Sequence, residues 1–276
     1  MAKSLKRFRL ILSGHSDPYY NMALDQALIN SVSNLGSPPI FRVYGWRPHG
    51  ISFGFTQKIE TILNIDRCNS GEIPYVRRMT GGSAILHKDD ISYSLIFKKD
   101  DLGIKGGVLD SYKVINSFLI RFYESLGLKV DYSGDKDSSI DLGVCSLSKE
   151  RYDIICKGLK IGGNAQRRKG SVIFQHGSIS LKDSSSELLK LLKDSSDNSS
   201  KKSISLDEAL GRELSFKKAQ DFLVRAFRDT FEVDFKESSL LEQELLNIIF
   251  LERNKYSTKD WNLKRRDHAK ETPSLA

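Results

Sequence analysis

The chain has 276 residues, of which 39% are apolar and 28% are charged, and its formal net charge is +8. A chain of this length holds one large domain or two small ones, and it buries about 70% or more of the surface that its unfolded form exposes, so no disulfide is needed for stability. No apolar run approaches the roughly 18 residues that a membrane span requires, and the N-terminus has no long apolar region before a cleavage site. We therefore expect a globular, cytoplasmic protein that makes no contact with a membrane.

The cysteines argue against two kinds of site. Cys68, Cys145 and Cys156 form no CxxC pair and are odd in number, so neither a disulfide framework nor a cysteine zinc site is indicated. On residue type alone, a lone cysteine is most often inert packing. The positive charge would attract a nucleic acid, a phosphate-bearing ligand or an acidic protein surface, but much of it lies in lysine-rich stretches that a solvated surface explains equally well.

The first hundred residues predict one helix among extended segments. Apolar residues alternate from Phe8 to Leu12, as in a strand, and residues 19–32 predict a helix that Asp17 introduces. Residues 40–57 alternate around the turn WRPHG, which favours a hairpin. Residues 91–97, ISYSLIF, alternate apolar and hydroxyl side chains, and this pattern predicts a strand with one buried face.

The rest of the chain predicts strands followed by helices. Residues 110–126 have helical spacing and end at Gly127. Strands are expected at 152–156, 159–161 and 172–179, and helices at 206–210, 217–230 and 239–252. Between them, residues 183–205 are rich in serine and lysine and predict a mobile excursion with one short helical patch at 186–192. Hairpin signals outnumber strand–helix–strand units, so we expect one α+β domain on a mixed, largely antiparallel sheet flanked by helices.

Two segments concentrate glycines, cations and a histidine: RRMTGGSAILH at 77–87 and GLKIGGNAQRRKGSVIFQHGS at 158–178. The first should lie in a loop between strands and the second on sheet edges. Glycine lets a loop approach a ligand without a Cβ, and consecutive backbone N–H groups can bind an anion or a carbonyl oxygen. A tight turn also explains a pair of glycines, so the pattern alone leaves both interpretations open.

The side chains of these segments include several candidates. Arg77 and Arg78 lie on alternate sides of a strand end, so only one of them faces a given ligand, where it would bind a carboxylate or a phosphate. Lys160 stands in a mainly apolar, glycine-flanked context that solubility does not explain, and we interpret it as functional. His87 and His176 are either core histidines or ligand-binding groups, and their spacing indicates no metal site.

Five motifs in this order resemble the lipoate-protein ligase and octanoyltransferase family: NMALDQAL, RRMTGGSAILH with DDISYSLIF, GLKIGGNAQRR, FQHGSISL and KYSTKDWN. The likeness extends over roughly residues 6–262. It implies one catalytic domain at residues 1–262, with a core similar to biotin-protein ligase and the class II synthetases, and a basic tail at 263–276 that we expect to be disordered. It also implies that the protein attaches an eight-carbon acyl chain to a lysine of a carrier domain.

The family contains ATP-dependent ligases and transferases, and this sequence is closest to the cysteine-dependent octanoyltransferases. Ligases typically carry a third glycine where Ser83 stands and often need an accessory domain. Octanoyltransferases take the acyl group from acyl carrier protein, and one branch places its nucleophilic cysteine where Cys145 stands. The resemblance therefore implies Cys145 as nucleophile and Lys160 as the group that stabilises the oxyanion, with no cofactor required; the ligase alternative would require ATP and Mg.

In this interpretation the two glycine-bearing segments surround the acyl chain and the reacting carbonyl. The substrate-binding residues would be Arg77, Arg78, Gly81, Gly82, Ser83, His87, Gly162, Gly163, Asn164 and His176, with Ile85 and Leu86 lining an apolar slot. The expected partners are octanoyl acyl carrier protein and lipoyl-carrier proteins, namely the glycine-cleavage H protein and the lipoyl domains of 2-oxoacid dehydrogenases. We expect a monomer without a metal site.

Three alternatives stay open. In an ATP-dependent lipoate-protein ligase, Lys160 would contact the adenylate phosphate and Cys145 would have no role. An amidotransferase that moves the acyl group between carrier proteins is a close variant that the sequence does not separate. A nucleic-acid binder is suggested only by basic clusters such as residues 167–169, and the sequence lacks a helix-turn-helix, zinc-finger or aromatic RNA-binding signature.

Overall fold

Two sheets organise the part of the chain that the computed structural model describes, namely residues 5–133, 153–193 and 202–270. The larger has eight strands in the order β11-β1-β2-β6-β10-β9-β8-β7, and the smaller has three in the order β4-β3-β5. The strands of the larger sheet are β1 (Lys6–Ser16), β2 (Ile40–Trp46), β6 (Asp90–Lys98), β7 (Val130–Tyr132), β8 (Ile154–Cys156), β9 (Leu159–Lys169), β10 (Val172–Ser180) and β11 (Val233–Glu237). Those of the smaller sheet are β3 (Gly50–Phe53), β4 (Tyr75–Arg77) and β5 (Ile85–His87).

The pairing confirms the predicted mixed, largely antiparallel architecture. β1 runs parallel to β2 and β11, and β3 runs parallel to β4, whereas the remaining pairs of neighbouring strands in the described ranges are antiparallel. The long antiparallel run from β2 through β6 and β10 to β9 matters most here, because it carries the second glycine-bearing segment to the centre of the sheet.

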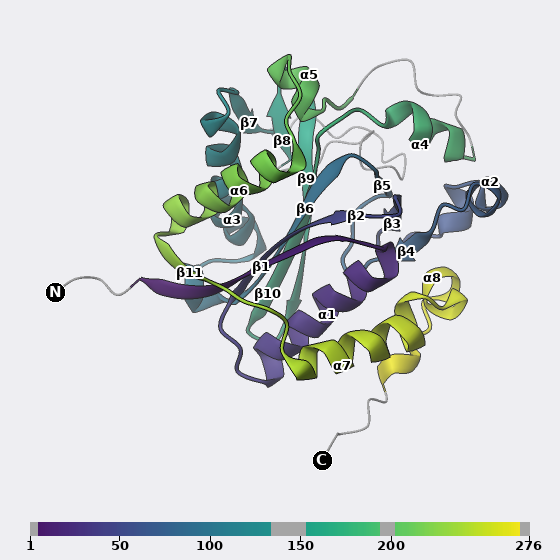
Figure 1. The fold of residues 1–276 in the computed structure, drawn as a ribbon, viewed down its shortest axis with the longest axis horizontal. Coiled ribbons are helices and arrows are strands. Elements are labelled where there is room, and N and C mark those ends of the chain that lie inside the picture. Colours follow the sequence, from purple (N-terminus) through teal and green to yellow (C-terminus); the bar gives the residue numbers. More distant parts are fainter. Residues whose placement is uncertain (1–4, 134–152, 194–201, 271–276) are drawn as a thin grey trace.

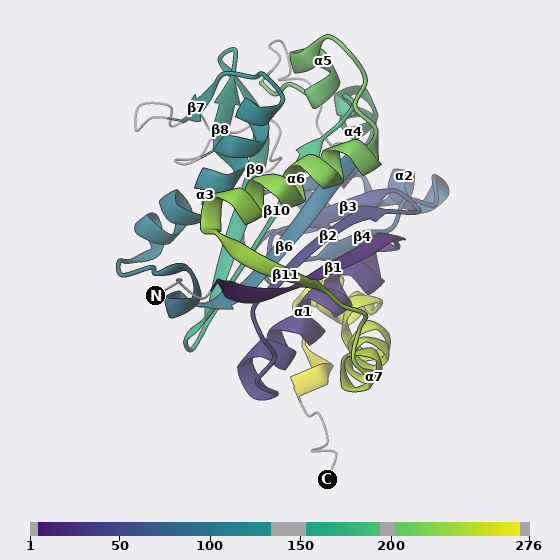
Figure 2. The ribbon, with the colours of Figure 1, turned by 60° about the vertical axis from the view of Figure 1, so that its left-hand side comes forward.

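Helices cover both faces of the larger sheet (Figures 1 and 2). On one face lie α1 (Pro18–Asn34) and α7 (Glu242–Leu251), and on the other lie α3 (Val108–Ser125) and α6 (Phe216–Phe231). Alternate residues of the strands divide between the two cores: Leu95 of β6 packs with α3 and α6, and Ile96 packs with α1. A third core joins the smaller sheet to α2 (Ile65–Ser70) and α4 (Ser185–Leu191).

Short elements complete the described chain. They are the 3-10 helices η1 (Ile59–Thr61), η2 (Lys99–Leu102) and η5 (His268–Lys270), the π-helix η4 (Glu252–Tyr256), and the α-helices α5 (Leu206–Leu210) and α8 (Lys259–Lys264). The predicted cap of α1 forms, because the Asp17 carboxylate accepts from Tyr19 N at 2.9 Å and from Tyr20 N at 3.0 Å. No helix in the described ranges is both long enough and apolar enough to cross a bilayer.

The predicted single buried face of β6 is wrong, because both faces of this strand are buried. Ser92 and Ser94 are 1% and 0% exposed, and their neighbours Ile91, Tyr93 and Leu95 are buried as well. Helix α1 covers this hydroxyl-bearing face, and Ser94 Oγ donates to Asp25 Oδ1 at 2.7 Å, while Ser92 Oγ accepts from Trp46 Nε1 at 2.9 Å. A hydroxyl that finds a partner is buried at little cost, so alternation with serine does not identify a solvent-facing side.

The predicted hairpin around WRPHG is also wrong. β2 pairs with β1 and β6, whereas β3 pairs with β4 and β5 in the smaller sheet. Both edges of β2 are therefore occupied, and none is available to β3. Alternation predicts that each segment is a strand, but it does not predict which strand lies beside it.

The chain beyond the predicted domain boundary at residue 262 is partly folded. α8 continues to Lys264, and η5 follows at His268–Lys270. Asp267 Oδ2 lies 2.8 Å from Lys255 Nζ, and Ala269 is 6% exposed. Residues 263–270, which we expected to belong to a disordered tail, therefore pack against the body of the protein.

The predicted excursion at 183–205 is also partly folded. Its expected helical patch forms as α4, from which Leu188 and Leu191 enter the third core. Further along, Lys202 O and Ile204 N bond to the main chain of β9. Residues 183–193 and 202–205 therefore belong to the packed structure.

Candidate active site

Two adjoining cavities lie between the β9–β10 hairpin and the segment from β4 to β5. They share Ile85, Lys160, Gly163 and Ser178. The one lined by His87 and His176, here called the histidine cavity, has an empty volume of about 510 Å³. The other, here called the serine cavity, has about 690 Å³ and is lined by the serines 178, 180, 184, 185, 203 and 205.

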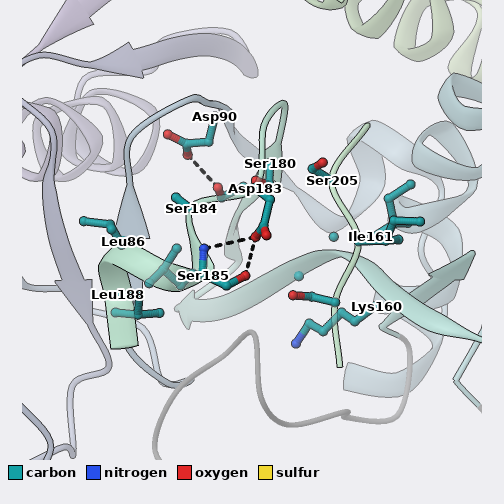
Figure 3. Close-up of a pocket in the computed structure, with 16 residues that line it drawn as sticks. Leu86, Asp90, Lys160, Ile161, Ser180, Asp183, Ser184, Ser185, Leu188 and Ser205 are labelled. Atoms are coloured by element: carbon teal, nitrogen blue, oxygen red, sulfur yellow. Dashed lines mark hydrogen bonds between the residues drawn. The ribbon is translucent and has the colours of Figure 1, made fainter. Parts of the chain in front are cut away.

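The fold brings together most of the residues predicted from the two glycine-bearing segments. One or both cavities are lined by Arg78, Gly82, His87, Lys160, Gly162, Gly163, Asn164 and His176. Ile85 and Leu86 also line them, as expected for an apolar slot. Figure 3 shows the serine cavity, with Leu86 and Leu188 on one side and Lys160 and Ile161 on the other. The remaining predicted residues of the described chain, Arg77, Gly81 and Ser83, are not among those that line either cavity.

Arg77 bonds to backbone carbonyls. Its Nη1 donates to the carbonyl oxygens of Phe55 and Gln57, both at 2.7 Å. Its Nη2 donates to Asn262 O at 2.6 Å, and its Nε donates to Trp261 O at 3.0 Å. Burial lowers the pKa of Arg77 to about 10, which leaves it charged at neutral pH. The side chain therefore ties the smaller sheet to α8, and its placement does not support the predicted substrate-binding role.

Arg78 is the arginine that faces the histidine cavity. Its Nη1 donates to Ser52 Oγ at 2.8 Å, and its Nη2 donates to Gly81 O at 3.1 Å and to Ser83 O at 2.9 Å. The loop thus wraps around the guanidinium. Gly82 has φ +90°, and a Cβ there would lie 3.2 Å from Arg78 Nη2, so this turn favours glycine. The guanidinium of Arg78 therefore holds the loop in this conformation.

His87 has a partner on each ring nitrogen. Nδ1 lies 2.8 Å from Asp90 Oδ2, and Nε2 lies 2.7 Å from Ser52 Oγ. The ring stacks on Trp46 with 3.8 Å between centroids. Asp90 Oδ2 also accepts from Ser178 Oγ at 2.6 Å. These contacts fix the orientation of the imidazole at the wall of the cavity.

His176 lies above a buried carboxylate. Its Nε2 is 2.7 Å from Thr80 Oγ1, and its Nδ1 is 3.7 Å from Asp25 Oδ2. Burial lowers the pKa of His176, against the opposing effect of Asp25. Burial alone would raise the pKa of Asp25, but Arg42, whose Nη1 lies 2.6 Å from Asp25 Oδ1, the nearby His176 and the hydrogen bond from Ser94 lower it overall. At neutral pH an ionised Asp25 therefore lies beside a neutral His176, and of these two only His176 lines the histidine cavity.

Lys160 lies at the junction of the two cavities. Its Nζ is 2.7 Å from Asp153 Oδ2, and the two side chains are 7% and 6% exposed. The main chain of Lys160 is paired with β8 and is also bonded to residues 202 and 204. Lys160 N donates to Lys202 O at 3.1 Å, and Lys160 O accepts from Ile204 N at 2.9 Å. A buried ammonium in a glycine-walled cavity can stabilise a negative oxygen that develops on a bound carbonyl.

Cys145, the predicted nucleophile, lies outside the described residues. The residues that flank its segment are described: Ser133 N donates to Asp153 O at 2.8 Å, and Asp153 lines the histidine cavity. Cys68 and Cys156 are buried, and burial raises the pKa of both thiols. Neither of these two lines the cavities, so the described cysteines offer no nucleophile there.

The sequence patterns missed several polar residues in or beside the cavities, among them Asp25, Arg42, Ser52, Asp90 and Asp153. Two of them carry a signal in the sequence, because Asp25 interrupts the apolar helix MALDQAL and Arg42 interrupts the apolar strand IFRVY. A charged residue between buried positions must find a partner. Within the described ranges, no group of three or more histidines, cysteines and acidic residues is arranged to hold a metal ion.

Comparison with known proteins places this geometry in a family. The family model for the lipoyl protein ligase A/B catalytic domain matches residues 17–228. Octanoyltransferase LipM of Moorella thermoacetica is 34% identical over 270 residues, which are 94% of this chain and 98% of that protein. Octanoyltransferase LipM of Anoxybacillus flavithermus is 32% identical over 273 residues, with the same two shares.

Solved structures share the fold. A bi-partite lipoate protein ligase from Thermoplasma acidophilum superposes with a TM-score of 0.79 at 22% identity, over 94% of this chain and 96% of that one. A lipoate-protein ligase A bound with ATP gives a TM-score of 0.77 at 24% identity, over 94% and 99% of the two chains. At these identities the likeness concerns the fold alone, and it confirms the expected helix-flanked mixed sheet.

Proposed function

Because this chain belongs to the lipoyl protein ligase A/B catalytic-domain family and is an octanoyltransferase, we propose that it moves an octanoyl group from acyl carrier protein to a carrier lysine through a thioester on Cys145. The proposed carriers are the glycine-cleavage H protein and the lipoyl domains of 2-oxoacid dehydrogenases. The observation that carries the proposal is the buried ammonium of Lys160 at the junction of the two glycine-walled cavities.

The proposed reaction has two steps. First, the thiolate of Cys145 bonds to the carbonyl carbon of the octanoyl thioester, the bond to the pantetheine sulfur breaks, and the pantetheine thiol leaves with a proton. Second, the amine of the carrier lysine bonds to the same carbon, the bond to Cys145 breaks, and the nitrogen loses its proton. The products are an amide and a free thiol. Because the thioester already stores the free energy needed, we propose that the transfer requires no nucleotide.

The contacts of Lys160 suit both steps. Each step passes through a tetrahedral intermediate with a negative oxygen, and an ammonium held in a low-dielectric cavity stabilises that oxygen strongly. Removing one such group typically lowers the rate by about 10²- to 10³-fold. Cys145 precedes Asp153 by eight residues, a span that reaches at most about 29 Å when extended, so the attachment of Asp153 at the cavity is compatible with the proposal.

The histidine cavity supplies a surface for the acyl tail. Met22, Trp46, Ile85 and Ala165 line it. Each buried methylene contributes roughly 0.8 kcal/mol, so an eight-carbon chain gains several kcal/mol from an apolar slot. The histidine cavity thus combines glycines, which allow close approach to a carbonyl, with apolar side chains that can contact a medium-length acyl chain.

Intact-mass spectrometry tests the proposal. The protein is mixed with octanoyl acyl carrier protein without ATP, and its mass should increase by one octanoyl group. Cys145→Ser should abolish the adduct, whereas Lys160→Met should slow its formation by about 10²- to 10³-fold. Cys68→Ala and Cys156→Ala are matched controls that should retain the adduct, because neither cysteine lines the cavities.

The same experiment separates the two alternatives within the family. If Cys145→Ser still modifies a carrier protein when ATP and free lipoate or octanoate are supplied, the protein acts as a ligase and the cysteine mechanism is excluded. If the adduct forms from an octanoylated carrier domain but not from octanoyl acyl carrier protein, the donor is the carrier domain and the enzyme is an amidotransferase.

A further inference from the structure

The carboxylate of Asp153 is the second half of the buried ion pair in the histidine cavity. Asp153 is 5% exposed as a whole residue, and its Oδ2 lies 2.7 Å from Lys160 Nζ. Both residues line the cavity. Such a pair carries a desolvation penalty that its attraction does not always offset, so a buried ion pair at a cavity wall is weak evidence for a purely stabilising role.

The main chain around the pair is constrained on both sides. Ile154 of β8 stands opposite Gly162, but Ile155 stands opposite Lys160, so the pairing of β8 with β9 contains a register shift at this point. Such an irregularity re-aims a side chain relative to its neighbours. On the other side, Lys202 and Ile204 bond to the backbone of Lys160. These contacts fix the position of the Lys160 backbone, whereas the four-carbon side chain remains flexible until its ammonium is held.

Asp153 is a partner of this ammonium. A carboxylate at hydrogen-bond distance favours the charged form of a lysine and restricts its rotamers. Both effects matter for a group that must present an ammonium at one point of a cavity. The other charged or titratable side chains that line the two cavities are Tyr44, Arg78, His87, Asp90, His176 and Asp183.

We propose that Asp153 is a positioning residue, which keeps the Lys160 ammonium charged and directed at the reacting carbonyl. This inference rests on the proposed function, because it assigns Lys160 the stabilisation of the oxyanion. In this role Asp153 acts on the reaction through Lys160. A variant without its charge should retain the nucleophile and the cavity but lose part of the electrostatic stabilisation.

The pH dependence of octanoyl-enzyme formation tests this role with Asp153→Asn and Asp153→Glu. The rate for Asp153→Asn should fall between about 10- and 100-fold, as for a misplaced catalytic group. At high pH the rate should decrease as Lys160 loses its proton, and in Asp153→Asn this decrease should begin about one pH unit or more lower. The reason is that a lysine without a neighbouring carboxylate loses its proton more readily. Asp153→Glu should restore part of the rate, and the pH at which the rate decreases should return most of the way to that of the unaltered protein. Asp131→Asn, which neutralises an exposed carboxylate on β7 outside the cavities, should change neither.

A double-mutant cycle separates positioning from folding. If Asp153 acts through Lys160, Asp153→Asn should cost little in the Lys160→Met background, so the two losses should be far from additive. Thermal unfolding of each variant shows which of them are folded. An unchanged rate and pH profile in a folded Asp153→Asn, or additive losses in the cycle, would overturn the inference while leaving the proposed function intact. Absence of any octanoyl-enzyme in the unaltered protein would instead overturn the proposed function.

Discussion

At the scale of single residues, the two neighbouring arginines of the first motif have opposite roles. Arg77 is enclosed by backbone carbonyls of the segment after β3 and of α8, whereas Arg78 faces the cavity and organises the glycine loop. Alternation along a strand end predicts that only one of two adjacent side chains faces a ligand. Which of them does so depends on what covers each side, and this information is absent from the motif.

The two glycines of the same loop should respond differently to substitution. Gly82→Ala should destabilise the protein by about 1 kcal/mol or more, because φ +90° disfavours an L side chain and the new Cβ would press on the guanidinium of Arg78. Gly81→Ala is the matched control for stability, since a Cβ there would meet no atom within 4 Å. Urea unfolding of both variants measures the difference; equal stability of the two would show that the loop conformation does not require glycine at position 82.

At the scale of elements, α1 and the central strands of the larger sheet are joined by polar side chains. Asp25 of α1 accepts from Arg42 of β2 and Ser94 of β6 and lies beside His176 of β10. This network allows β6 to be buried on both faces. It also means that His176, which lines the histidine cavity, gains or loses its proton at the interface between α1 and the larger sheet.

The stability of the protein should therefore fall as the pH decreases below about 6.5, the ordinary pKa of histidine. Burial lowers the pKa of His176 in the folded state, so between that lower value and 6.5 the unfolded chain binds a proton that the folded chain does not. The contribution is fully present above 6.5 and is lost as the pH falls through this window. Chemical unfolding at pH 7.5 and 5.5 measures the loss, and His176→Gln should reduce it. An equal loss in that variant would assign the acid sensitivity to other groups.

At the scale of the whole molecule, distant parts of the chain hold the site together. The carbonyls of residues 261 and 262 bind Arg77, next to the residue that faces the cavity. Lys255 in the π-helix bonds to Gln26 of α1 and to Asp267 near the described C-terminal end. The last described turns are thus part of the structure that supports the cavity.

Removal of residues 263–276 should lower the melting temperature. The truncation deletes Asp267, the carboxylate beside Lys255, and the buried Ala269. Loss of one partner of a largely buried ion pair is destabilising because the other charge is left desolvated. Calorimetry of the truncated protein checks this, and Asp267→Asn isolates the ion pair within the full chain. A truncated protein with unchanged melting temperature would mean that residues 263–270 do not contribute to stability.

Local pattern was sufficient for most helices and strands. The spacing of apolar residues predicts α1, α3, α6 and β10 close to their observed bounds, because burial on one side of an element repeats with the period of that element. Position within the glycine motifs also predicts Arg78, Gly82, His87, Lys160 and His176, which line the cavities. The roles of the site residues and the nucleophilic role of Cys145 stay predictions.

The sequence by itself determined most of the longer elements of this protein, its mixed sheet and the family to which it belongs, since these follow from short-range periodicity or from ordered motifs. Only the tertiary structure decided that β2 and β3 enter different sheets, that Arg77 is enclosed by carbonyls, and that Asp153 meets Lys160. The physical reason is that strand partners and buried ion pairs depend on contacts between distant segments. The local sequence of a strand does not specify which strand pairs with it, and the sequence around a charged residue does not specify its ion-pair partner.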